Sequence, residues 1–91
     1  MIDIVELLEN IPEGEECVIT FTNGNEFGLQ DFEGVDSSIY GRDDLVVAEV
    51  VTQMNCDRRY SKPGTSLEFS FRDIATVNGI DIEHWVKEKG K

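Results

Sequence analysis

The segment around Asn23-Gly24 constrains the fold of this chain more than any other feature of its sequence. Residues 17–22 and 25–32 flank this pair, and each is rich in apolar and β-branched side chains. Asn-Gly accepts the positive φ angles of a type I′ turn, so the pattern predicts a β-hairpin with a two-residue loop. In that register Val18 lies opposite Leu29, and both faces of the hairpin are partly apolar. The sequence therefore predicts a sheet that is covered on two sides.

Three further segments have the composition of strands. Residues 45–52 are almost continuously apolar and β-branched, which predicts a central strand buried on both faces. Residues 66–72 alternate strictly between polar and apolar side chains, which is typical of a strand with one solvent-exposed face. A tight turn at Arg72-Asp73 then leads into a short fifth strand at 74–77, and Asn78-Gly79 turns the chain again.

The two ends of the chain carry helical patterns. Residues 3–11 have a capping box at their start and apolar side chains at helical spacing, and Pro12 ends the predicted helix. Residues 80–87 fit either a small hairpin or a strand end that passes into a short helix, and we favour the second. Trp85 is expected to close the core from this end, with an exposed contact as the alternative.

The remaining residues are polar and turn-rich. Residues 33–44 and 53–65 are expected to form two loops, and residues 1–91 to form one domain. Short antiparallel strands without crossover helices predict a mainly β fold of the α+β kind. We expect a short N-terminal helix, then five antiparallel strands in a small SH3-like or Sm-like barrel or a bent sheet, and a short C-terminal helix.

Charge is concentrated in the first part of the chain. Residues 1–55 hold 13 acidic and one basic side chain, whereas residues 56–91 hold six and seven, for a net charge of −11 over 91 residues. Such a surface repels phosphate backbones and attracts basic proteins, although acidity is also a common means of staying soluble. The start of the chain has no positively charged export leader, and no apolar run reaches the length of a membrane span. We expect a cytoplasmic protein with no membrane contact.

Two segments resemble the Sm-like branch of the SH3-type small barrels. Residues 18–24, Val-Ile-Thr-Phe-Thr-Asn-Gly, are similar to the strand and turn of the Sm motif, and residues 67–77 are similar to its last two strands. The resemblance covers about half of the chain. It departs from the family pattern because Gly28 follows Gly24 by four residues rather than five, and because the Arg-Gly of the second Sm motif is missing.

The missing elements help to form the uridine pocket of Sm proteins, so the resemblance does not imply RNA binding here. Among proteins of this architecture, the acidic Rof-type inhibitors of the termination factor Rho are the most similar in charge and size. They occupy a nucleic-acid-binding surface on another protein, and this likeness implies a bacterial or phage protein that acts in the same manner. Sm-like folds often assemble through strand edges, so a homo-oligomer is a further expectation.

No pattern of catalytic or metal-binding residues is visible in the sequence. A calcium loop beginning at Asp31 fails, since Asp36 stands where glycine is required and Arg42 where the bidentate acid belongs. His84 is the only histidine, which argues against a catalytic triad or a zinc site, and neither cysteine belongs to a Cys-x-x-Cys pair. Cys56 is expected to be an ordinary thiol. We expect no enzyme activity, no cofactor and no metal.

Two candidate binding sites follow from the charge pattern. The first is an acidic face that engages a positively charged protein surface, in its sharpest form as a nucleic-acid mimic or regulator. Its residues are Glu26, Asp31, Glu33, Asp36, Asp43, Asp44 and Glu49. The alternative is a nucleic-acid-binding small barrel that uses a basic, aromatic loop able to hold phosphate or stack a base, although a solvated loop tip would have the same composition. Its residues are Arg58, Arg59, Tyr60 and Lys62.

Overall fold

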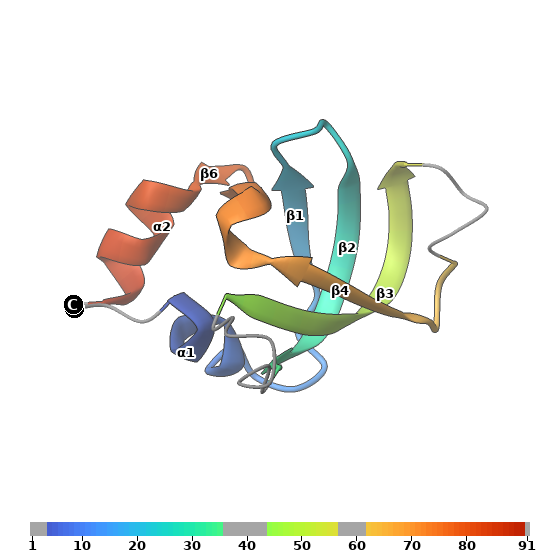
Figure 1. The fold of residues 1–91 in the computed structure, drawn as a ribbon, viewed down its shortest axis with the longest axis horizontal. Coiled ribbons are helices and arrows are strands. Elements are labelled where there is room, and N and C mark those ends of the chain that lie inside the picture. The colour runs from blue at the N-terminus through green and yellow to red at the C-terminus, as the bar shows by residue number, and fades with distance from the viewer. Residues whose placement is uncertain (1–3, 36–43, 57–61, 91) are drawn as a thin grey trace.

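The computed structural model describes residues 4–35, 44–56 and 62–90 (Figure 1). In chain order the elements are α1 (Ile4–Glu9), β1 (Cys17–Phe21), β2 (Glu26–Gly34), β3 (Leu45–Asn55), β4 (Ser66–Ser70), the 3₁₀ turn η2 (Phe71–Asp73), β5 (Ile74–Val77), β6 (Ile80–Asp81) and α2 (Ile82–Lys89). None of the helices in these ranges is long and apolar enough to cross a membrane.

The strands form one antiparallel sheet in the order β4-β3-β2-β1-β5-β6. The expected mainly β fold with a helix at each end is confirmed, with a sixth strand of two residues. This order does not close on itself, and β3 bends along its length (Figure 1), so of the two expected forms the structure has the bent sheet. In the described part of the chain β4 pairs with β3 alone, so the sheet keeps an edge there.

The predicted register of the first hairpin is wrong by one residue. Ile19 pairs with Phe27, and Cys17 pairs with Leu29. The amide of Gly24 donates to the carbonyl of Phe21 at 2.9 Å, and Gly24 alone in this loop has a positive φ, at 92°. This is a three-residue loop in which a type I turn is followed by a left-handed glycine, rather than a two-residue type I′ turn.

The one-residue shift changes which side chains share a face. Burial alternates along β1, where Cys17, Ile19 and Phe21 are buried while the residues between them are half-buried. β3 alternates in the same way, with Val46 and Ala48 buried and their neighbours partly exposed. The prediction that residues 45–52 are buried on both faces is therefore wrong, and this chain itself covers one side of the sheet only in part. We call the buried side the core face and the other side the outer face.

The second Asn-Gly pair forms the turn that was expected of the first. Asn78 and Gly79 have φ angles of 53° and 79°, as a type I′ turn requires, and Val77 pairs with Ile80 across it. β6 then passes directly into α2, which confirms the interpretation favoured for the C-terminal segment. The side chain of Asp81 caps this helix by accepting from the amide of Glu83 at 3.0 Å.

Both helices contribute to one hydrophobic core. Leu8 of α1 is completely buried, and Trp85 of α2 is 4% exposed, so its predicted place in the core is confirmed. The predicted N-terminal helix is also confirmed from Ile4 to Glu9, whereas Asp3 of its capping box lies outside the described residues. α1 packs against the end of β2, where a methyl group in place of the hydrogen of Gly34 would lie 2.6 Å from a side-chain carbon of α1.

The two predicted loops begin later than expected, because the strands before them are longer. β2 continues to Gly34, and the amide of Val35 still donates to the carbonyl of Leu45 at 3.0 Å. β3 continues to Asn55. The central parts of both predicted loops, residues 36–43 and 57–61, lie outside the described residues.

Candidate protein-interaction surface

A β-bulge in β2 shapes the acidic part of the surface. The register between β2 and β3 shifts between Gln30 and Glu33, and Asp31 has a positive φ of 57°. Its carboxylate accepts from the amide of Gly14 at 2.8 Å, which anchors the turn after α1 to the bulge. Because of the extra residue, Phe32 points into the core and Glu33 points into solvent.

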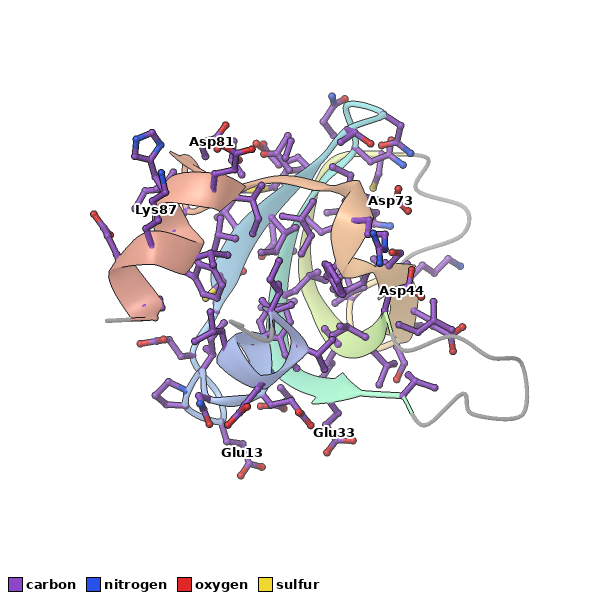
Figure 2. All side chains as sticks on the ribbon, turned by 60° about the vertical axis from the view of Figure 1, so that its left-hand side comes forward. Glu13, Glu33, Asp44, Asp73, Asp81 and Lys87 are labelled. Atoms are coloured by element: carbon purple, nitrogen blue, oxygen red, sulfur yellow. The ribbon has the colours of Figure 1, made fainter. Side chains whose placement is uncertain are left out.

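Four carboxylates gather beside this bulge. They line a shallow depression of about 490 Å³ between α1, the turn that follows it and β2. The acids are Glu9, Glu13, Asp31 and Glu33, which we call the acidic surface. Figure 2 shows Glu13 and Glu33 pointing away from the body of the protein on the same side. Glu9 is held in place because its carboxylate accepts from the amide of Gly34 at 3.2 Å.

A second depression of about 300 Å³ extends the acidic surface across β3. It is lined by Asp31 and Glu33 on one side and by Glu49 and Ser66 on the other. Glu49 accepts from the side-chain amide of Gln30 at 2.6 Å, which fixes its direction. Among the residues that the structure describes, no lysine or arginine lines either depression. The fields of neighbouring carboxylates add, so these described side chains together give this surface a negative potential.

The seven acidic residues that the sequence analysis assigned to one acidic face do not all lie together. Asp31, Glu33 and Glu49 are brought together. Glu26 lies at the opposite end of β2, where its carboxylate accepts from the hydroxyl of Thr20 at 2.9 Å. Asp36 and Asp43 lie outside the described residues.

Asp44 does not contribute its charge to this surface, because it is only 7% exposed. The hydroxyl of Ser70 donates to the Oδ2 of Asp44 at 2.5 Å, and the Nε of Arg72 lies 3.9 Å from the same oxygen. Asp44 therefore joins the start of β3 to the end of β4.

Glu9 and Glu13 were missed by the sequence prediction. The helical spacing of residues 3–11 already turned Glu9 away from the apolar stripe. What the sequence did not contain was the place on the sheet where α1 docks, which depends on the close approach at Gly34 and on the hydrogen bond from Gly14 to Asp31. No local signal links these residues to a strand about 20 positions later.

The basic loop considered as the alternative site is largely untested by the structure. Arg58, Arg59 and Tyr60 lie outside the described residues, while Lys62 is exposed. Nucleic-acid binding through this loop stays a prediction.

A groove of about 350 Å³ lies between the tip of the first hairpin and β4. Three phenylalanines form its floor, with Phe21 in edge-to-face contact with Phe27 at 6.0 Å and with Phe69 at 5.1 Å between ring centroids. We call it the aromatic groove, and its other lining residues are Thr22, Asn23, Asn25, Leu67, Glu68 and Asp73. An apolar floor with a polar and acidic rim suits one apolar side chain flanked by cationic groups.

The two cysteines and the single histidine lie in different surroundings. Burial raises the pKa of the Cys17 thiol above its ordinary value of 9.0, against a smaller opposing effect of its hydrogen bond with Asn78, so this thiol is a poor nucleophile. Cys56 is half-buried, and both cysteines are free. His84 is exposed. Among the residues that the structure describes, no three histidine, cysteine or acidic side chains are grouped so as to hold a metal ion.

Comparisons with models of protein families, with curated proteins and with solved structures found no match to this chain.

Proposed function

We propose that this protein is a small, non-enzymatic acidic interaction module that binds a positively charged protein surface through its acidic surface. The observation that supports this proposal is that carboxylates from α1, the following turn and β2 surround one depression, and no basic side chain is among the described residues that line it. Hydrogen bonds from the amides of Gly14 and Gly34 hold two of these carboxylates, Asp31 and Glu9, in fixed positions. A prearranged set of charges binds an oppositely charged partner without a large ordering cost.

The overall charge supports the same proposal. A net charge of −11 on 91 residues accelerates encounter with a basic partner and opposes binding to nucleic acid. In the sharpest form of the proposal the acidic surface occupies the nucleic-acid-binding site of its partner, as the resemblance to Rof-type proteins implies. The Sm-like relationship itself stays a prediction. Two free cysteines agree with a reducing compartment, so we place the module in the cytoplasm within this proposal.

Charge reversal tests whether the acidic surface is the binding site. The partner is first identified by affinity purification from the native host at low and high salt. Its affinity is then measured for the natural chain and for the double variant Glu13→Lys with Glu33→Lys. We expect a loss of about tenfold or more at low salt that shrinks at high salt.

A matched control separates a local contact from the effect of overall charge. The variant Glu83→Lys with Glu88→Lys carries the same change in net charge on α2, where both glutamates are exposed. It should bind within about twofold to threefold of the natural chain, since distant exposed charges are screened. Equal losses in the two variants would show that only net charge matters, and an unchanged affinity in the first variant would exclude the acidic surface.

Competition tests the mimicry. If the acidic surface occupies a nucleic-acid-binding site, a single-stranded oligonucleotide should displace the protein from its partner in a concentration-dependent manner. Simultaneous binding of both would retain the interaction module but refute the mimicry.

A further inference from the structure

The outer edge of β4 has backbone groups without a strand partner in the described part of the chain. The amide of Phe71 donates to the carbonyl of Asp44 at 3.0 Å, which identifies the hydrogen-bonded positions between β3 and β4. In an antiparallel pair every second residue of a strand forms backbone hydrogen bonds to the neighbouring strand. The backbone amide and carbonyl of Phe69 therefore face β3, whereas those of Ser66 and Glu68 point outward. Both of these residues are exposed, which leaves a short template to which another strand can pair.

The aromatic groove lies beside this edge on the core face. Leu67 of β4 lines one side of it, and Phe69 of β4 joins Phe21 and Phe27 of the first hairpin in its floor. A strand added at β4 would lie along the groove. Alternate side chains of that strand would share the face of Leu67 and Phe69, because directly paired residues point to the same side of a sheet. The groove therefore favours apolar side chains at these positions.

The outer face beside the same edge is acidic. Glu33 pairs with Val47, and Val47 pairs with Glu68, so one row across β2, β3 and β4 begins and ends with a glutamate. The next position in this row belongs to the added strand and lies about 5 Å from Glu68. In the neighbouring row Glu49 pairs with Ser66. Cationic side chains are favoured at these positions of the added strand.

We propose that the outer edge of β4 binds an extended peptide segment, antiparallel to β4, in which basic residues alternate with apolar residues. The basic side chains lie on the outer face beside Glu68, and an apolar side chain enters the aromatic groove. This inference rests on the proposed function, because it specifies how one segment of a basic partner is held. Main-chain hydrogen bonds supply affinity and the two faces supply selectivity.

A second copy of this chain is a poor occupant of the edge. Two molecules that each carry a net charge of −11 repel one another, and pairing two β4 edges would bring Glu68 of both copies to the same short interface. A basic segment, in contrast, is attracted to the acidic outer face beside Glu68.

A seven-residue peptide tests the proposal on the natural protein. The probe alternates lysine and valine, with lysine at both ends, and carries a fluorophore for anisotropy measurements at low salt. Two versions are N-methylated, one at the lysine amides and one at the valine amides. In the proposed pairing the lysine opposite Glu68 exchanges hydrogen bonds with it, whereas the valine amides point to solvent.

We expect methylation at lysine to weaken binding by about tenfold or more, and methylation at valine to weaken it by less than about threefold. Equal affinities of the two methylated peptides would overturn strand addition. A loss confined to the valine-methylated peptide would overturn the antiparallel pairing. A peptide of the same composition with its lysines grouped together should bind at least several-fold more weakly than the alternating one, and equal binding would overturn the role of the two faces.

Two variants at one position separate backbone pairing from charge. Glu68→Thr removes the carboxylate and keeps the outward amide, so it should weaken the unmethylated peptide by only a few-fold. Glu68→Pro removes the amide as well and should weaken it by about tenfold or more. Proline is tolerated at an outward-facing position of an edge strand, and Trp85 fluorescence reports whether the variant is folded. Equal affinities of the two variants would overturn backbone pairing, and the methylated peptides decide the question if the proline variant does not fold.

Failure of this inference is distinguishable from failure of the proposed function. Absence of binding by the alternating peptide at millimolar concentration would overturn strand addition, while the charge-reversal test at Glu13 and Glu33 would still stand. Conversely, a partner that ignores those reversals but competes with the alternating peptide would refute the acidic surface and retain the β4 edge.

Discussion

The hydroxyl of Ser70 offers a direct test of how the end of β4 is held. Ser70 and Asp44 are each 7% exposed, and the hydroxyl donates to the Asp44 carboxylate at 2.5 Å. The hydroxyl oxygen of Ser70 in turn accepts from the amide of Arg72 at 3.1 Å and so caps η2. Ser70→Ala removes both interactions while preserving the backbone.

The magnitude follows from the burial of this pair. A hydrogen bond to a charged acceptor contributes about 1.5–3 kcal/mol. Water cannot readily replace the lost hydroxyl, because the Asp44 side chain is only 9% exposed, so the full contribution is lost. The loss at the Arg72 amide adds less, since that residue lies at the surface and water can replace the hydroxyl. We expect Ser70→Ala to lower the free energy of unfolding by about 2–3 kcal/mol. For a domain of this size the melting temperature should fall by about 8–24 °C.

Trp85 provides the assay, because it is the only tryptophan and is 4% exposed in the folded protein. Its fluorescence during urea unfolding gives the free energy of unfolding for each variant. Ser66→Ala is the matched control, since it removes an exposed hydroxyl from the other end of β4 and should cost less than about 0.5 kcal/mol. A loss below about 0.5 kcal/mol for Ser70→Ala, or a loss equal to that of the control, would refute the reasoning. Combining it with Asp44→Ala should reveal a coupling energy of about 1–2 kcal/mol.

Three further predictions concern the turns, the docking of α1 and the buried thiol. Gly34→Ala places a methyl group 2.6 Å from a side-chain carbon of α1, so α1 must shift, and urea unfolding should show a loss of about 1–3 kcal/mol. Asn78→Ala removes a residue suited to a φ of 53°, and it also removes the acceptor for the amide of Val18 at 2.8 Å. The free energy of unfolding should fall by about 1–2 kcal/mol. A melting temperature equal to that of the natural chain would contradict this prediction. Since burial raises the pKa of Cys17 in the folded state, the unfolded chain loses this proton first, and stability should fall as the pH rises through and above 9.0. Unfolding curves between pH 7 and 10.5 should show this decline, and Cys17→Val should reduce it; an unaltered slope would assign the decline to other groups.

Much of the fold was predictable because its signals are local. The alternation of residues 66–70, the apolar run of β3 and the helical spacing of α1 each depend on neighbours within a few positions. The two Asn-Gly pairs show where this reasoning ends. Both are turns, but only Asn78-Gly79 is of type I′, and Asn23 keeps a negative φ in a three-residue loop. Turn type depends on the register of the strands on both sides, and a dipeptide does not contain that information.

The candidate site was predictable in part for the same reason. Asp31, Glu33 and Glu49 come together because β2 and β3 are neighbours in the sheet. Glu13 joins them only because the turn after α1 is bonded to the bulge at Asp31. Asp44 has the same charge in the sequence as the others, yet its burial against Ser70 removes it from the surface.

The sequence by itself determined the sign and uneven distribution of the charge, the positions of most strands and turns, and the helical ends. Net charge is a sum over residues, and strands and helices follow from hydrophobic periods of two and 3.6 residues within a single segment. None of these properties depends on contacts with distant segments. The tertiary structure decided the hairpin register, the open edge at β4 and the members of the acidic surface. Each of these depends on contacts between distant segments, and because side chains alternate along a strand, a shift of one residue exchanges the buried face for the exposed one.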